Sequence, residues 1–349
     1  MTDRSPLTVL DSLNQGLHQA MADNAQVMFL GEDILDPYGG SFKVARGLSS
    51  AYPDRVLPTP ISEAGITGIA GGMALRGMRP VVEIMFGDFS TLIADQVINH
   101  LTKFNAMYNG QVTVPVVIRT PMGGRRGYGP THSQTLEKLF LGTPGLTVLA
   151  PFHIKGDHEL GGPGQLLYEA IVGLDSPVFF IENKLQYLLK LLIPYDLEEY
   201  DLAETGTSGN IRFPCYKLSL RSAPAAQLTL TAYGYMAHLA LGAIHNLAYE
   251  YEIFCELLVP THLAPFDLSP LYESVSKTKR LLAVEEGTLS LGWGAEVLAR
   301  TAEALGAGLT RAGRLTARGT VIPVALDLEA DCLPDVADIV TRAREMVQK

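Results

Sequence analysis

The chain has 349 residues, of which 47% are hydrophobic and 18% charged, and a formal net charge of -10. This length suits two α/β domains better than a single core. No run of Lys or Arg exceeds a pair, and no apolar run reaches the ~20 residues of a membrane span, so neither nucleic acid nor a membrane is an expected partner. Three widely spaced cysteines and an N-terminus without a leader-like pattern predict free thiols in the cytoplasm.

The N-terminal half alternates helical and strand patterns. Apolar residues recur at helical spacing from Leu7 to Met21, after Ser5-Pro6, which is typical of a cap followed by a first-turn proline. A second helix is expected from Leu92 to Met107, and Asn109-Gly110 would end it. Short apolar runs lie between the helices and predict a buried parallel sheet; they are residues 27–30, 81–86, 114–118, 146–150 and 178–181.

A change of composition indicates the domain boundary. Residues 191–222 are rich in acidic residues, Gly, Thr, Ser and Pro, and we expect them to form a linker. A second and smaller alternation of strands and helices follows. The fold class expected is therefore α/β, with two doubly wound domains at residues 1–190 and 223–349.

Glu63 lies in the segment TPISEAG, at the start of a helix whose next turns are small and apolar. Taken alone, such an acid is most simply a helix-capping residue. The strand RPVVEIMFGDF ends nearby with Phe86 and Phe89, and ligands of open α/β sheets bind at the carboxyl edge of the strands. A buried carboxylate beside an aromatic ring suits a flat heterocycle, because the acid bonds a ring nitrogen while the aromatic ring stacks on the heterocycle.

Seven ordered segments carry a resemblance to a known family: GED at 31–33, TPISEAG at 59–65, RPVVEIMFGDF at 79–89, DQVIN at 95–99, VPVVIRTPMGG at 114–124, GYGPTHSQ at 127–134 and IPVALDLEADCLPDVADIV at 322–340. The chain resembles the β subunits of thiamine-diphosphate-dependent 2-oxoacid dehydrogenases, which are transketolase-like enzymes. The resemblance implies a pyrimidine-binding domain followed by a transketolase C-terminal-like domain. It also implies oxidative decarboxylation of a 2-oxoacid, with pyruvate as the default, and acyl transfer to lipoamide.

The resemblance implies a role for individual residues. Glu63 would bond the aminopyrimidine ring of thiamine diphosphate and favour the tautomer that removes the thiazolium proton. Phe89 would stack on that ring, Ile61 would line its pocket, and Glu32 would line a tunnel between paired active sites. His132 matches a histidine that contacts the substrate carboxylate or passes protons and the acyl group. Without the resemblance, Glu32 is equally well explained as a solvated loop residue, and a surface histidine is the simpler explanation of His132.

Two further pairs of residues are candidates for binding. Arg125 and Arg126 add positive charge beside the His132 loop, where they would steer an anionic 2-oxoacid or contact a lipoyl-bearing partner; solvated arginines are the simpler explanation. Ile171 and Asp175 lie where some relatives bind a monovalent cation, here K⁺, through carbonyl and carboxylate oxygens.

The chain lacks the G-D-G motif with a downstream Asn that holds Mg²⁺ and diphosphate in thiamine-diphosphate enzymes. The resemblance therefore implies an α subunit that holds both, in a heterotetramer of two α and two β chains, with the lipoyl acyltransferase component as a further partner. Two alternatives remain: a subunit of an acetoin-cleaving or carboligating enzyme, and a non-catalytic scaffold paralogue. Retention of Glu63 and His132 argues against the scaffold.

Overall fold

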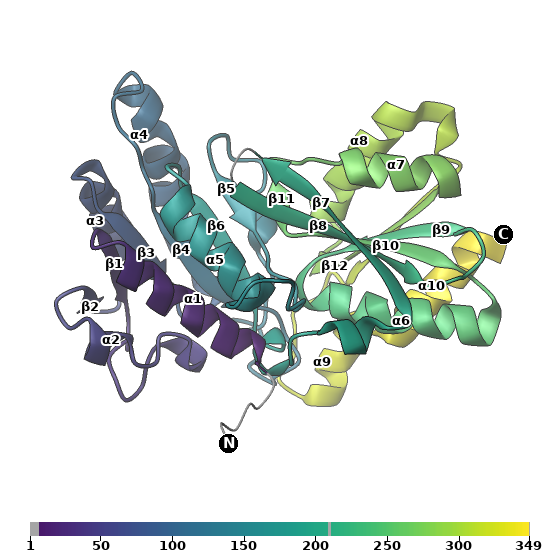
Figure 1. Cartoon of the computed structure of the whole chain (residues 1–349), viewed down its shortest axis with the longest axis horizontal. Helices are drawn as coiled ribbons and strands as arrows, with labels where there is room; N and C mark the ends of the chain where they lie inside the picture. The colour runs from purple at the N-terminus through teal and green to yellow at the C-terminus, as the bar shows by residue number, and fades with distance from the viewer. Residues whose placement is uncertain (1–6, 209–210, 349) are drawn as a thin grey trace. The chain divides into compact units, whose positions relative to one another are not determined.

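The computed structural model describes residues 7–208 and 211–348. The chain divides into two compact units (Figure 1). The first unit contains the described residues up to Gly123 together with Leu139–Leu192, and the second contains Gly124–Lys138 together with the described part of Ile193–Lys349. The loop between Gly124 and Lys138 thus belongs to the second unit, although first-unit segments flank it in the sequence.

The first unit is built on a parallel sheet. Its strands are β1 (Val27–Gly31), β2 (Val56–Pro58), β3 (Arg79–Glu83), β4 (Val117–Met122), β5 (Thr147–Leu149) and β6 (Val178–Asn183). They lie in the order β5-β6-β4-β3-β1-β2, and each neighbouring pair is parallel. The apolar runs predicted this sheet, although β4 begins three residues after the start of its run. Helices cover a parallel sheet because its strands need crossover connections.

The helices of the first unit are α1 (Val9–Asp23), α2 (Leu48–Ala51), α3 (Glu63–Leu75), α4 (Thr102–Met107) and α5 (Gly161–Gly173). Thr8 begins α1 with a capping box: its side chain accepts the Asp11 N–H at 3.2 Å, and its own N–H donates to the Asp11 carboxylate at 3.3 Å. The expected cap, Ser5-Pro6, lies outside the described residues.

The expected helix from Leu92 to Met107 is helical in three different forms. A 3₁₀ segment at Gly87–Ile93 leads into a π-helical segment at Gln96–Leu101, and α4 follows. The Thr102 hydroxyl donates to the carbonyls of Val97 and Ile98 at 3.1 and 3.0 Å, which occupies carbonyls of the widened turn. Asn109 and Gly110 end the helix with φ of 54° and 73°, as predicted.

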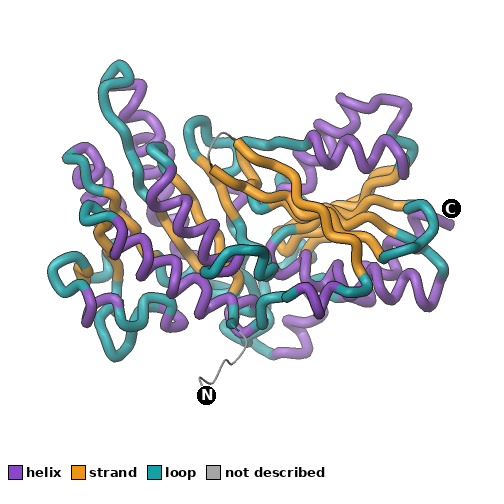
Figure 2. Tube along the Cα trace, in the orientation of Figure 1, coloured by secondary structure: helices purple, strands orange, loops and turns teal. Residues whose placement is uncertain are grey.

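The second unit has a mixed sheet in the order β13-β12-β9-β10-β8-β7. The strands are β7 (Tyr200–Ser208), β8 (Ile211–Leu220), β9 (Leu228–Ala232), β10 (Cys255–Pro260), β12 (Arg280–Thr288) and β13 (Arg311–Ala317). The short β11 (His262–Ala264) is not one of the strands of this sheet. Helices α6 (Gly234–Tyr251) and α10 (Val336–Gln348) pack together on one side of this sheet, and α7 (Ser269–Thr278) and α8 (Trp293–Leu305) lie on the other (Figures 1 and 2). Helix α9 (Leu326–Cys332) precedes α10.

The segment expected to be a linker is mostly strand. Within residues 191–222, β7 and β8 pair antiparallel, and β8 pairs antiparallel with β10. This hairpin forms one edge of the second sheet, where one strand face meets solvent and tolerates polar residues. Its polar composition therefore reflects an edge position. The boundary between the units, after Leu192, lies close to the expected residue 190.

Helices α1 and α5 approach each other at glycines. A Cβ at Gly164 would overlap the Ser12 carbonyl oxygen, and a Cβ at Gly16 would overlap the Gly164 carbonyl oxygen. The Ser12 hydroxyl accepts the Gly164 N–H at 2.8 Å and donates to the Leu160 carbonyl at 2.5 Å. The close approach therefore depends on the absence of side chains at both glycines.

Among the described residues, no helix is long and apolar enough to cross a membrane.

We expect Gly164→Ala to destabilise the first unit by about 1–3 kcal/mol, because the new methyl group forces α1 and α5 apart. Gly72→Ala in α3 is the matched control, since no atom lies within 4 Å of a Cβ at that position; it should stabilise the helix by about 0.5–1 kcal/mol. Urea unfolding followed by circular dichroism measures both. Equal midpoints for Gly164→Ala and the parent chain would contradict the packing argument.

Candidate functional site

Three neighbouring parallel strands bring the candidate residues of the first unit to one edge of its sheet. Glu32 directly follows β1, Glu63 follows β2 by five residues, and Phe86 and Phe89 follow β3. Strand β1 pairs with both β2 and β3 in parallel, so the carboxyl ends of all three strands meet at the same edge. The structure therefore brings Glu32, Glu63 and Phe89 to the edge where ligands of α/β sheets bind.

Glu63 is the first residue of α3 and is only 7% exposed. Its backbone carbonyl accepts a hydrogen bond from the Thr67 hydroxyl at 2.8 Å. The N-cap residue Ser62 makes no side-chain capping bond; instead its backbone N–H donates to the Glu32 carboxylate. Ile61, just before this turn, is 83% exposed, which leaves a large apolar side chain beside the buried acid.

Glu32 and Glu63 form a pair of buried acids. Glu32 is 5% exposed, and burial, followed by the charge of Glu63, raises its pKa above the ordinary value. Within the part of the chain that the structure describes, Glu32 Oε1 is buried and has no hydrogen-bond partner. Two acids without a neutralising cation suit a ligand that brings N–H donors, and an aminopyrimidine ring is such a ligand.

Aromatic rings continue the site along the same edge. The Phe86 and Phe89 rings lie 5.9 Å apart in an edge-to-face arrangement, and Phe42 lies 5.9 Å from Phe86 and 5.4 Å from Tyr187. The Lys184 Nζ lies 5.2 Å from the centre of the Phe86 ring. Phe86 is half-buried, and its ring packs against the Phe89 ring.

A buried ion network lies at the base of these aromatic rings. The Arg119 guanidinium on β4 is fully buried, and it donates to Glu182 Oε1 at 2.7 Å and also to the Glu83 carboxylate. The Tyr187 hydroxyl donates to Glu182 Oε2 at 2.6 Å, and the Ser41 N–H donates to Glu83 Oε1 at 2.6 Å. Residue patterns did not predict this network. Its signal in the sequence is a charged residue within each of three largely apolar strands, β3, β4 and β6.

His132 lies in the second unit, between Gly124 and Lys138, and is half-buried. Its backbone N–H donates to the Gly129 carbonyl at 3.3 Å, and its Nδ1 lies 3.0 Å from the Thr131 hydroxyl oxygen. Glu63 and His132 are therefore carried by different compact units. The role of His132 remains a prediction.

The two arginines of this loop differ. The Arg125 backbone has φ of 66°, and its guanidinium donates to the Pro334 carbonyl, so this side chain ties the loop to its own unit. The Arg126 guanidinium lies 5.9 Å from the centre of the Tyr128 ring. Of the pair, Arg126 is the better candidate for contact with a substrate or partner.

The expected cation ligands already bond to a fixed positive charge. The Arg79 Nε donates to the Ile171 carbonyl at 2.7 Å, and its Nη1 donates to Asp175 Oδ1 at 3.0 Å. A guanidinium thus satisfies both groups, and the K⁺ site stays a prediction. Across residues 7–208 and 211–348, no cluster of three or more His, Cys, Asp or Glu side chains is arranged to hold a metal ion.

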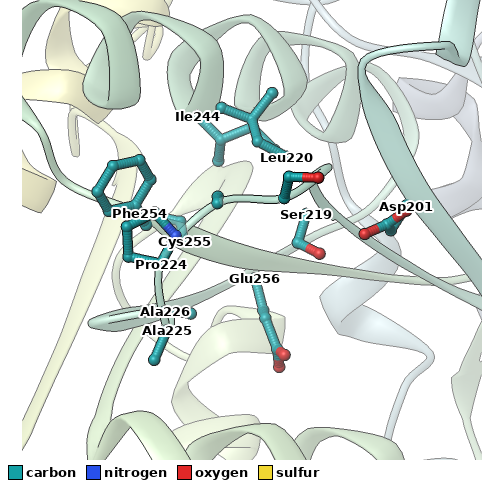
Figure 3. A pocket seen from close by; sticks show the side chains of 12 residues that line it. Asp201, Ser219, Leu220, Pro224, Ala225, Ala226, Ile244, Phe254, Cys255 and Glu256 are labelled. Carbon is teal, nitrogen blue, oxygen red and sulfur yellow. The ribbon is translucent and has the colours of Figure 1, made fainter.

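A cavity of about 310 Å³ lies in the second unit, beside the β8–β9 turn (Figure 3). Its lining includes Asp201, Cys255, Glu256 and the segment from Ser222 to Ala226. The two carboxylates pair with Arg221 at 3.2 Å and Lys217 at 3.9 Å. No residue expected for the site lines this cavity.

Comparison with known proteins gives two family matches that together span most of the chain. Residues 5–188 match the transketolase pyrimidine-binding domain, and residues 219–339 match the transketolase C-terminal domain. A solved structure described as a split-gene transketolase, inactive β4 tetramer, superposes with a TM-score of 0.70 over 99% of both chains at 17% identity, which supports the fold alone.

Curated relatives match over nearly the whole chain. The mitochondrial pyruvate dehydrogenase E1 component subunit beta-2 of Oryza sativa subsp. japonica is 34% identical over 97% of this chain and 85% of its own length. The subunit beta-1 of Arabidopsis thaliana is 34% identical over 97% of this chain and 88% of its own length. The human subunit beta is 32% identical over 96% of this chain and 89% of its own length.

The Glu32–Glu63 pair predicts a pH-dependent stability. The Glu32 pKa is higher in the folded chain than its ordinary value of 4.5. The favourable contribution of protonated Glu32 to folding is therefore complete below pH 4.5, and it is lost as the pH rises through the pKa of the folded chain. Glu32→Gln removes the charge, so we expect a higher unfolding midpoint than the parent chain at pH 7.5, with the gain vanishing near pH 4.5.

Thermal unfolding across this pH range tests the prediction. Asp54→Asn is the matched control, because Asp54 is an exposed acid of the same unit and does not contribute to the raised Glu32 pKa. A midpoint for Glu32→Gln that follows the parent chain at every pH would refute the buried-pair interpretation.

Proposed function

The chain belongs to the family of pyruvate dehydrogenase E1 β subunits, and we propose that it activates thiamine diphosphate for decarboxylation of a 2-oxoacid together with an α chain. Pyruvate is the favoured substrate and lipoamide the acyl acceptor, as in the family. The observation that supports this most directly is the pair of buried acids, Glu32 and Glu63, at the carboxyl edge of the pyrimidine-binding sheet, the edge at which Phe89 follows β3.

Glu63 is the proposed catalytic acid of this chain. Bound thiamine diphosphate would supply the nucleophilic carbon and the electron sink of the reaction. Glu63 would hold a proton at a pyrimidine ring nitrogen, and its burial excludes water that would compete for that hydrogen bond. Burial and the charge of Glu63 raise the Glu32 pKa, so Glu32 would take up a proton more readily than an ordinary carboxyl, which limits the repulsion between the two acids.

Ile61 and Phe89 would hold the ring itself. Phe89 is half-buried, its ring lies 5.9 Å from the Phe86 ring in an edge-to-face arrangement, and it would stack on the pyrimidine ring. Ile61 is 83% exposed in the isolated chain, and a ring against it would cover apolar surface. These residues suit the pyrimidine half of the cofactor. Holding Mg²⁺ and the diphosphate would fall mainly to the α chain, since the described residues hold no acidic metal cluster.

Helix α3 supports the need for a partner chain. After Glu63 its sequence, AGITGIAGGMAL, contains no charged residue. Its solvent-facing side includes Ala64, Gly65, Gly72 and Ile69, the last of which is 59% exposed. A helix that is apolar all round is normally buried, so this face would be covered in the assembly. We assign it to the α chain of a heterotetramer.

The residues proposed to act on the substrate belong to the second unit. His132 would contact the 2-oxoacid or pass protons, and Arg126 would attract its carboxylate or a lipoyl-bearing partner. The described cysteines, Cys215, Cys255 and Cys332, are free thiols, which supports a reducing compartment such as the cytoplasm.

The test is titration of thiamine diphosphate and Mg²⁺ into the purified chain, alone and after co-expression with an α chain of the family. We expect binding only in the mixture. Glu63→Gln in the mixture should still bind the cofactor but lower kcat for pyruvate by roughly 10²–10⁴-fold, because the proton at the ring nitrogen is no longer held by an acid.

Glu159→Gln, an exposed acid of the same unit, is the matched control and should leave kcat unchanged. Tight binding to the isolated chain would refute the shared site. No binding in either sample would favour the scaffold. Turnover of acetoin but not of pyruvate would favour the acetoin-cleaving alternative.

A further inference from the structure

We propose that Glu329, in the C-terminal domain, is a positioning residue that holds the His132 loop in its working conformation. The inference rests on the proposed function of His132. Its structural part stands independently, because every contact that supports it lies within the second unit.

Glu329 binds the start of the loop with both carboxylate oxygens. Its Oε1 accepts the Arg125 N–H at 2.8 Å, and its Oε2 accepts the Gly127 N–H at 2.9 Å. The carboxylate lies on α9, more than 200 residues along the chain, and is 1% exposed. Hydrogen bonds to a buried carboxylate are stronger than neutral ones, so this contact is a firm anchor.

The loop backbone is shaped for this anchor. Arg125 and Gly127 both have φ of 66°, a conformation that is unfavourable for the arginine. The conformation persists because the surroundings stabilise it: Glu329 accepts the Arg125 N–H, and the Arg125 guanidinium donates to the Pro334 carbonyl. Without the carboxylate, the strained turn would relax.

Further contacts fix both ends of the loop. The Gly124 N–H donates to Glu286 Oε1 at 2.6 Å. At the other end, the Tyr233 hydroxyl donates to Glu137 Oε1 at 2.7 Å, and Lys138 Nζ donates to the Thr288 hydroxyl at 2.5 Å. His132 lies between these anchors, so its position depends on them. Glu329 is the anchor with two bonds to the loop backbone near the strained residue.

The substitution Glu329→Gln tests the proposal in the full chain, assembled with the α chain. One amide oxygen remains as an acceptor, but the NH₂ group faces an N–H donor, so one of the two anchoring bonds is lost. Asp331→Asn is the matched control, because Asp331 is an exposed acid on the same short helix. Both changes remove one negative charge from α9.

The first readout is backbone hydrogen exchange of peptides covering residues 124–131. We expect exchange to be faster by about ten-fold or more in Glu329→Gln and unchanged in Asp331→Asn, with the global unfolding midpoint nearly constant. Unchanged exchange in Glu329→Gln would overturn the proposal. Because this measurement needs neither cofactor nor turnover, failure of the proposed function would not affect it.

The second readout is a double-mutant cycle with His132→Ala. If Glu329 acts through His132, Glu329→Gln should lower kcat/KM about ten-fold or more in the parent assembly but very little in the His132→Ala background, and thiamine diphosphate affinity should be unchanged in both. Additive losses would overturn the positioning role. If the loop exchanges faster in Glu329→Gln but the parent assembly turns over no 2-oxoacid, the proposed function is refuted. Glu329 would then be a structural anchor only.

Discussion

The burial of Arg119 between two glutamates is the interaction on which the first unit depends. Glu83, Arg119 and Glu182 lie on the adjacent strands β3, β4 and β6, so the guanidinium holds three neighbouring strands together. One positive charge faces two negative ones, and burial raises the pKa of Glu83 to about 7 despite the arginine. Such a network is costly unless every member is bonded, and Ser41 and Tyr187 supply the remaining donors. Through Tyr187 and Phe42, it supports the aromatic rings that lead to Phe89.

The second unit buries acids in a different way. Glu285 Oε1 accepts a hydrogen bond from the Gly294 N–H at 3.0 Å. Burial, followed by the charge of Glu137, raises the pKa of Glu285 to about 8. Glu286 and Glu329 likewise accept backbone N–H groups. Backbone donors cannot move away as a lysine side chain can, so these acids fix the path of the chain. The consequence is that the loop from Gly124 to Lys138 belongs to the second unit.

The sequence predicted the parts of the fold that depend on local patterns. Apolar runs located strands of both sheets, and Asn109-Gly110 located a helix end. The β7–β8 hairpin was missed because an edge strand alternates polar residues, and the composition of residues 191–222 resembles a linker. The π-helical turn was missed because apolar spacing predicts a helix but does not distinguish its form. The Glu329 anchor joins residues about 200 positions apart, and no local pattern carries such a pairing.

The same difference between local sequence patterns and contacts of distant residues applies to the candidate site. Glu63, Phe89 and His132 are candidates because they lie in short motifs, but the contacts that position Phe89 and His132 come from residues distant in the sequence. Phe89 depends on a buried guanidinium that it does not touch, and His132 depends on acids of β12 and α9. Because the acid that would bind the cofactor and the histidine that would contact the substrate belong to different units, the chain can tune either one without altering the other. Changes in Arg119 or Glu83 should therefore act on the cofactor side, and changes in Glu286 or Glu329 on the substrate side, even though all four residues are buried and none was a candidate site residue from the sequence.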